Sequence, residues 1–128
     1  EQSLAELFTA EWSMPTDFYV GLDDRGTVAE ADTLADLSGE PDGTNGYARV
    51  SCAVSTSGFT ASQVSGDWQA QTKTVTFTAS GGSIGPVSNA FLATTSDNTG
   101  RLFQTKPLAQ SRTLADGESR DVSLIIGF

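Results

Sequence analysis

The stretch Thr72-Lys73-Thr74-Val75-Thr76-Phe77-Thr78-Ala79 has the clearest pattern in the chain. Apolar Val75, Phe77 and Ala79 alternate with threonines, so the two sets face opposite sides of an extended strand. β-branched and aromatic side chains also favour strands. The stretch therefore predicts a half-buried β-strand, which the Gly81-Gly82 pair ends.

Similar segments lie on both sides of this strand. Strands are expected over residues 17–22, 47–56, 87–95, 101–105 and 122–128, with another short piece running from residue 107 towards residue 114. Residues 33–37 are expected to form a short helical turn, and residues 39–46 and 57–67 to form loops rich in Gly and Ser. Short strands joined by turns indicate a single mainly β domain over residues 1–128, an antiparallel β-sandwich or jelly-roll-like barrel.

The N-terminal segment has a different pattern. Ser3 and Glu6 have the spacing of a capping box, and apolar side chains recur on one helical face at Leu4, Leu7, Phe8 and Trp12. Pro15 ends the pattern, which predicts a short N-terminal α-helix within residues 1–14. Because three turns of helix are marginally stable alone, the apolar face packs either on the strands of its own domain or on a neighbouring chain.

The composition excludes several classes of function. The 128 residues contain no His and one Cys, which rules out a Ser-His-Asp triad, most zinc sites and an intrachain disulfide. A net charge of −9 makes the chain a poor ligand for nucleic-acid phosphates. No apolar run is long enough to cross a bilayer. We therefore expect a protein that is not an enzyme and binds neither nucleic acid nor membrane.

The negative charge is concentrated at one end of the sequence. Residues 1–46 hold eleven of the 16 acidic side chains and one of the seven basic ones, Arg25. The remaining residues are close to neutral. Two interpretations stay open: acidic loops that keep the protein soluble, or an acidic end that orients the molecule on a basic partner.

The acidic residues do not predict a metal or catalytic site. Asp23, Asp24, Glu30, Asp32 and Asp36 offer carboxylates for Ca²⁺, but their spacing does not match an EF-hand loop. Adjacent Asp23 and Asp24 on a strand point to opposite faces, which argues against a carboxylate pair for glycoside cleavage. We expect no metal, no cofactor and no catalytic residue.

Several short motifs follow one another in order along nearly the whole chain. They include the leading helical segment, Phe18-Tyr19-Val20-Gly21-Leu22, Gly46-Tyr47-Ala48-Arg49, Val75-Thr76-Phe77, Gly100-Arg101-Leu102-Phe103 and Pro107-Leu108. In this order they resemble small virion structural proteins of tailed phages, and Gly46-Tyr47-Ala48-Arg49 is the most specific piece. The resemblance implies a head-decoration or tail-fibre-like component of a phage particle.

Seven residues are candidate contacts with other subunits: Leu4, Leu7, Phe8, Trp12, Tyr47, Arg49 and Trp68. Tyr47 and Arg49 lie two residues apart on an expected strand, so they face the same side, and both types are common interface anchors. The alternative is local, with Arg49 bracing the acidic loop at residues 36–42. Trp68, in a polar stretch, is either an exposed contact or the cover of a barrel end. Cys52 is expected to be a small buried residue.

The resemblance leads to a functional expectation, a capsid-decoration (cement) protein on the capsid exterior. It would bind the major capsid protein or other virion subunits and stabilise the assembled shell by mass action. A homo-oligomer, with a trimer favoured, would strengthen weak contacts through effective concentration. The alternatives are a tail, baseplate or fibre-attached structural component, and a receptor- or carbohydrate-binding module.

Overall fold

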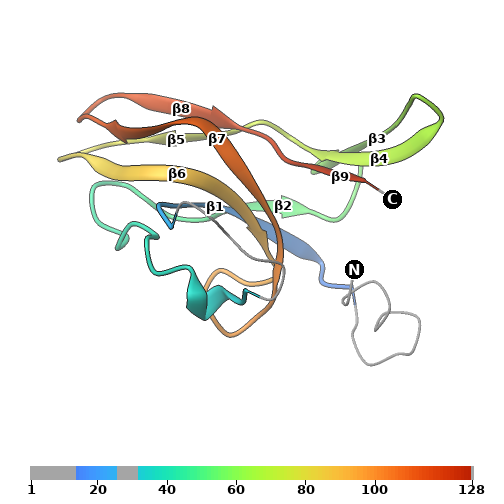
Figure 1. Cartoon of the computed structure of the whole chain (residues 1–128), viewed down its shortest axis with the longest axis horizontal. Coiled ribbons are helices and arrows are strands. Elements are labelled where there is room, and N and C mark those ends of the chain that lie inside the picture. The colour runs from blue at the N-terminus through green and yellow to red at the C-terminus, as the bar shows by residue number, and fades with distance from the viewer. Residues whose placement is uncertain (1–13, 26–31, 128) are drawn as a thin grey trace.

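The computed structural model describes residues 14–25 and 32–127, which form a mainly antiparallel β fold (Figure 1). The elements within these residues are β1 (Asp17–Asp23), the 3₁₀ helix η1 (Leu34–Asp36), β2 (Val50–Ala53), β3 (Phe59–Val64), β4 (Asp67–Thr72), β5 (Val75–Thr78), β6 (Ile84–Ala93), β7 (Leu102–Leu114), β8 (Ser119–Val122) and β9 (Ile125–Gly127). Hydrogen bonding divides the strands into a four-stranded sheet of order β2-β1-β6-β7, a three-stranded sheet of order β3-β4-β9, and the pair β5-β8.

The two smaller sheets are parts of one long ribbon. Along the chain β4 leads into β5, and β8 leads into β9. β4 pairs antiparallel with β9, and β5 pairs antiparallel with β8. Between the pairs Gln71–Ile125 and Val75–Val122, three residues on one strand face two on the other. Across this irregularity the Thr72 N–H donates to the Leu124 carbonyl at 2.9 Å, and the Leu124 N–H donates to the Thr72 hydroxyl at 2.9 Å. The Thr72 side chain therefore takes the place of a backbone acceptor and keeps the ribbon joined.

The main core lies where the β5-β8 part of the ribbon faces the four-stranded sheet. Val75 and Phe77 of β5 are buried in one cluster with Phe18, Val20 and Leu22 of β1. The threonines of β5 are exposed on the opposite face, as the alternating pattern predicts. In Figure 1 the ribbon that contains β5 and β8 runs above β6 and β1.

The other face of the four-stranded sheet has a smaller core under η1. Leu34 and Leu37 pack there against Phe91 and Ala93 of β6. Gly21 pairs with Phe91 across the strands, and a Cβ atom at Gly21 would lie 2.4 Å from Phe91 Cζ. The Phe91 ring therefore lies directly over a position that has no side chain.

The structure confirms some of the sequence-based expectations and not others. The mainly antiparallel β class and the helical turn at residues 33–37 are confirmed. A sandwich or jelly-roll-like barrel is not confirmed, because the described strands pair as three sheets. The α-helix predicted within residues 1–14 falls almost wholly on residues 1–13, which lie outside the described residues.

Four strand predictions are wrong in detail. Of the strand expected over residues 47–56, only β2 (Val50–Ala53) is present, so Tyr47 and Arg49 precede it. Residues 57–67, expected as a loop, contain β3 and the turn into β4. The expected break near residue 107 is absent, because β7 continues from Leu102 to Leu114. The final expected strand, residues 122–128, is divided between the end of β8 and β9. Pro107 is compatible with β7 because this strand forms the edge of its sheet, where a missing N–H is tolerated.

Candidate docking surface

Arg49 lies at the centre of a partly buried polar network between two loops. Its Nε and one Nη2 hydrogen donate to the Glu40 carboxylate at 2.8 and 2.7 Å. Nη1 donates to the carbonyl oxygens of Thr95 and Asp97, and Nη2 also donates to Asn98 Oδ1 at 2.7 Å. All five N–H groups of the guanidinium therefore have an acceptor. The side chain is only 4% exposed.

Tyr47 binds the same carboxylate from the neighbouring position. Its hydroxyl donates to Glu40 Oε2 at 2.7 Å and accepts the Leu22 N–H at 3.0 Å. The ring stacks on Phe77 with centroids 5.8 Å apart. Burial, together with the bond to Glu40, raises the pKa of Tyr47 far above its usual value. Tyr47 and Arg49 thus both bind Glu40, although they precede β2 and do not lie on the strand expected there.

The network confirms the local interpretation of Tyr47 and Arg49. Both side chains brace the acidic loop through Glu40, and both are buried within the molecule. A contact of Tyr47 or Arg49 with another subunit stays a prediction. Little of either side chain is accessible to a partner in the described structure.

Three of the acidic residues considered for calcium are engaged in local interactions, and Glu30 lies outside the described residues. Buried Asp23 accepts the backbone N–H groups of Arg25 and Gly39, at 2.8 and 3.0 Å. Asp32 pairs with the Arg25 guanidinium at 2.6 Å. Asp36 accepts the N–H and hydroxyl of Thr33, and these hydrogen bonds lower its pKa. No group of three or more potential metal ligands occurs within residues 14–25 and 32–127.

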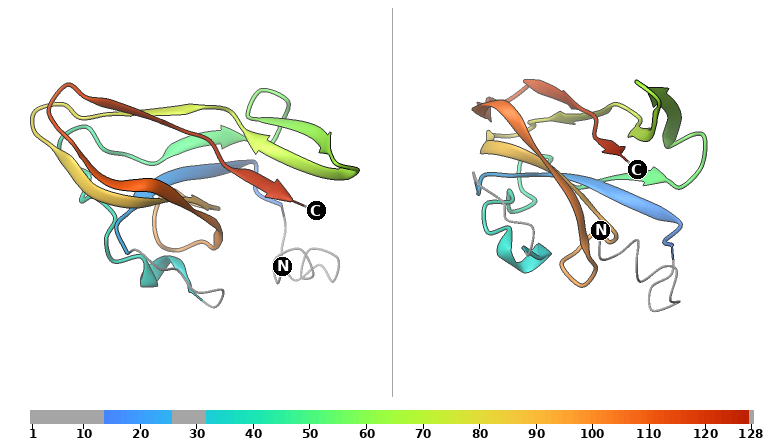
Figure 2. Two further views of the ribbon diagram at one scale, coloured as in Figure 1. Left: turned by 45° about the horizontal axis from the view of Figure 1, so that its top comes forward. Right: turned by 45° about the vertical axis from the view of Figure 1, so that its right-hand side comes forward.

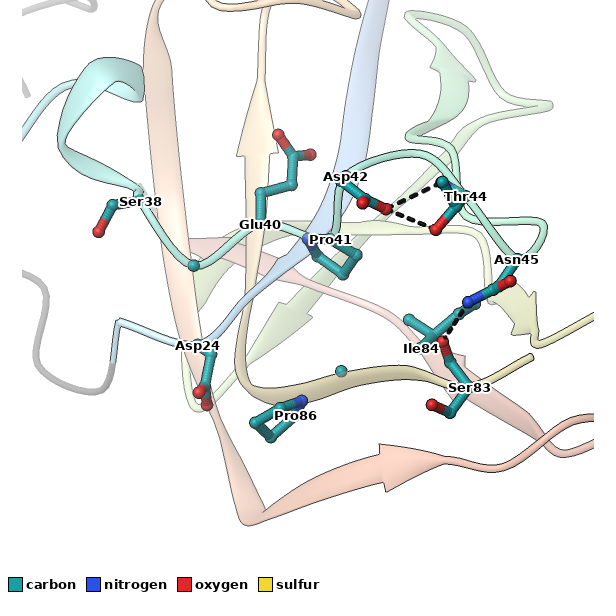
Figure 3. Close-up of a pocket in the computed structure, with 12 residues that line it drawn as sticks. Asp24, Ser38, Glu40, Pro41, Asp42, Thr44, Asn45, Ser83, Ile84 and Pro86 are labelled. Atoms are coloured by element: carbon teal, nitrogen blue, oxygen red, sulfur yellow. Dashed lines mark hydrogen bonds between the residues drawn. The ribbon is translucent and has the colours of Figure 1, made fainter.

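A pocket of about 410 Å³ opens beside this acidic loop (Figure 3). Asp42 accepts the Thr44 hydroxyl and N–H at 2.6 and 3.1 Å, and Asn45 Nδ2 donates to the Ser83 carbonyl at 2.8 Å. The lining contains no aromatic side chain on which a sugar ring could stack. Its polar groups thus mainly hold the loop against the Ser83 segment.

The most exposed apolar surface lies on the hairpin of β3 and β4. We call this hairpin, residues 59–72, the β3–β4 arm. It extends away from the four-stranded sheet in Figure 1, and both views of Figure 2 show it at the periphery. Trp68 and Val64 are 59% and 52% exposed, and Ile125 on the neighbouring β9 is 41% exposed. Trp68 is therefore an exposed side chain and does not cover a barrel end.

One face of the arm continues the apolar core outward. The register places Trp68 opposite Gln63, Ala70 opposite Ala61, and Thr72 opposite Phe59. Phe59 is partly buried against the main core. The face thus runs from the core at the root of the arm to an exposed tryptophan near its tip.

The sequence does not reveal this arm, because neither face of β3 is buried. Its residues Phe-Thr-Ala-Ser-Gln-Val are partly or fully exposed throughout. Without a buried face there is no apolar alternation to detect. The signals in the sequence are Trp68 within a polar stretch and the Ser65-Gly66 pair, and in the structure both residues of this pair have positive φ.

The remaining candidates add no further surface. Leu4, Leu7, Phe8 and Trp12 lie outside the described residues. Cys52 is buried and unpaired, as expected, and burial raises the pKa of its thiol. None of the described helices is long and apolar enough to cross a membrane.

Comparison with known proteins identifies a family. The family model described as podophage GP4 fiber I protein gp80 matches residues 1–124. No curated protein and no solved structure matches the chain.

Proposed function

The chain belongs to the podophage GP4 fiber I protein gp80 family, and from this premise we propose that it is a subunit of a tail fibre or of a fibre-attached structure. Family membership makes it a structural protein of a phage virion. The match over residues 1–124 is the observation that carries the proposal, because it covers nearly all of the 128 residues.

The family description favours the tail alternative over capsid decoration. A fibre component would have other fibre or tail subunits as partners, in place of the major capsid protein. The capsid-decoration hypothesis rested on a resemblance common to several kinds of virion protein, and no comparison adds support for it. A fibre family also suggests a structural role in place of catalysis.

The structure suggests how such a subunit would act. A fibre component works by contact, and the described residues offer one projecting feature with exposed apolar side chains, the β3–β4 arm. The buried network around Arg49 holds the loops of the domain body in a fixed arrangement. We therefore propose a rigid body that carries its contact surface on an arm.

The location of the chain on the particle tests this proposal. Gold-labelled antibodies against the purified chain are applied to intact phage and imaged, and heads and tails are then separated and probed with the same antibodies. We expect labelling of fibres and recovery with tails. Labelling of the head surface, with recovery in the head fraction, would overturn the fibre proposal and restore capsid decoration.

A further inference from the structure

We propose that two copies of the chain pair through the outer edge of β3, so that two three-stranded sheets join into one six-stranded antiparallel sheet. The inference rests on the proposed function, for which it names a second copy of the chain as the partner of the β3–β4 arm. Four features of the arm carry it: its open edge, the lack of protection on that edge, the self-complementary register and the low charge.

The outer edge of β3 has peptide groups that point away from β4. The Lys73 N–H donates to the Gly58 carbonyl at 2.8 Å, which makes this pair a hydrogen-bonded pair of the ladder. Because such pairs alternate in an antiparallel ladder, the peptide groups of Phe59, Ala61 and Gln63 point outward. The Phe59 N–H does donate outward, to Ser55 at 3.0 Å. Within the described chain, no backbone group pairs with the outward groups of Ala61 and Gln63.

Beyond Phe59, whose N–H is taken by the Ser55 carbonyl, this edge lacks the features by which proteins usually block strand pairing. Edge strands are commonly protected by short length, by Lys or other charges, or by Pro. β7, at one edge of the four-stranded sheet, contains Lys106, Pro107 and Arg112. β2, at the other edge, has only four residues. β3 has six residues and contains neither a charge nor a proline.

An antiparallel pair of β3 strands is self-complementary about Ala61. A two-fold axis through this position places Ala61 opposite its own copy and Phe59 opposite Gln63. The Ala61 N–H groups then donate to the Ala61 carbonyls across the axis, while each Phe59 N–H keeps its bond to the Ser55 carbonyl of its own chain. Since the axis is perpendicular to the sheet, both Trp68 side chains lie on the same face. Only Gln63 then separates the Trp68 near each arm tip from the Phe59 at the root of the other arm.

The charge distribution favours a second copy over a charged partner. Between residues 59 and 72 the only charged side chain is Asp67, in a chain with a net charge of −9. Two acidic molecules can therefore meet at the arm without bringing their acidic loops together. β3 has no charged side chain with which a basic partner could form an ion pair. A second copy of β3 has the same polarity and can pair with the first in the register described above.

The molecular mass of the full chain in solution tests the pairing. A strand pair of this length buries less than the roughly 1,600 Å² of a standard interface, so light scattering after size exclusion is measured over a concentration series. We expect twice the 13.4 kDa chain mass at high concentration and the single mass on dilution. A wild-type chain that stays monomeric throughout, or that forms the trimer expected from the sequence, would overturn the two-fold pair.

Charge substitutions at Ala61 test the register. Ala61→Lys and Ala61→Glu each place like charges opposite one another at the axis, which is unfavourable across strands. We expect each variant to be monomeric alone, and an equimolar mixture to recover the doubled mass. The matched controls are Gln71→Lys and Gln71→Glu, because Gln71 is exposed on the central strand β4 and lies away from the open edge. We expect both controls to pair as the wild type does.

Each outcome decides a separate point. Circular dichroism and melting temperature confirm that each Ala61 variant is folded. If a folded Ala61→Lys chain keeps the doubled mass, or the mixture stays monomeric, the β3 pairing is wrong. A monomeric chain that labels fibres would overturn the pairing and leave the proposed function intact. A paired chain that labels heads would overturn the function and leave the pairing intact.

Discussion

Arg49 and Arg112 both bind a carboxylate at nearly the same distance, but their surroundings differ. The Arg49–Glu40 pair is 2.7 Å apart, with side chains 4% and 19% exposed. The Arg112–Glu118 pair is 2.8 Å apart, with side chains 47% and 44% exposed. Removing one partner of a buried pair leaves an uncompensated charge, whereas exposed ions are solvated by water.

We therefore predict unequal effects for two matched substitutions. Arg49→Met should lower the free energy of unfolding by about 3 kcal/mol or more, because the Glu40 charge and several carbonyl groups lose their donor. Arg112→Met should change it within the error of the measurement. Urea unfolding followed by tryptophan fluorescence measures both. Equal losses for the two variants would show that the Arg49 network is not a stabilising centre.

The hydroxyl of Tyr47 predicts a dependence of stability on alkaline pH. The pKa of Tyr47 is raised in the folded protein above the ordinary value of 10.0, mainly by burial. Above that pH the unfolded chain releases the proton while the folded chain retains it, so this contribution to stability falls as the pH rises. Tyr47→Phe lacks the titrating group and should cost about 1–3 kcal/mol at neutral pH, since the Leu22 N–H loses its acceptor.

The measurement compares unfolding free energies of wild type and Tyr47→Phe from neutral pH to pH values above 10. We expect the difference between the two proteins to narrow as the pH rises. A difference that stays constant over this range would mean that Tyr47 ionises equally in the folded and unfolded chains.

The sequence predicts only part of this network. Tyr47 and Arg49 stand out in their short motif, and the acidic loop that contains Glu40 lies close by in the chain. The acceptors Thr95, Asp97 and Asn98 lie almost fifty residues further on, and nothing in their local pattern links them to Arg49. Partners joined only by the tertiary fold cannot be found from spacing along the chain.

At the scale of elements, predictability follows burial. The alternation along β5 is predicted correctly, because its side chains have one buried and one exposed face, although the strand covers only Val75–Thr78 of the expected residues 72–79. β3 is missed because it has no buried face. The division between β8 and β9 is also missed, since the apolar run that spans it gives no sign of the irregularity at Thr72. Local patterns thus identify strands that line a core and fail for strands that project from it.

Thr72 joins the two parts of the ribbon, and its hydroxyl can be tested separately from its shape. Thr72→Val keeps the volume but leaves the buried Leu124 N–H without an acceptor, which should cost about 1–3 kcal/mol. Thr72→Ser keeps the acceptor and should retain more stability. Thr76→Val serves as a control, because the Thr76 hydroxyl bonds to Asp121 at an exposed position. A loss for Thr76→Val as large as for Thr72→Val would contradict the role assigned to the Thr72 hydroxyl.

At the scale of the whole molecule, charge and exposed apolar surface are separated. Asp36 belongs to η1 and Glu40 to the loop that follows it, and in Figure 1 this segment lies away from the β3–β4 arm. The arm holds the exposed Trp68 and Val64 and a single charge. The two interpretations of the acidic end, solubility or orientation on a basic neighbour, therefore stay predictions, and neither of them involves the arm proposed for pairing.

The same separation predicts how salt affects pairing. The proposed contact contains no ion pair that salt could weaken, but each copy carries a net charge of −9. Added salt screens the long-range repulsion between two acidic molecules, over about 10 Å at 0.1 M and less at higher concentration. We therefore expect the dissociation constant of the pair to fall or stay constant as sodium chloride rises. Sedimentation equilibrium at low and high salt measures it, with an Ala61→Lys and Ala61→Glu mixture as the control, because an engineered ion pair at the axis should be weakened by salt. A wild-type pair that dissociates in high salt would indicate that the acidic loops, and not the arm, hold the copies together.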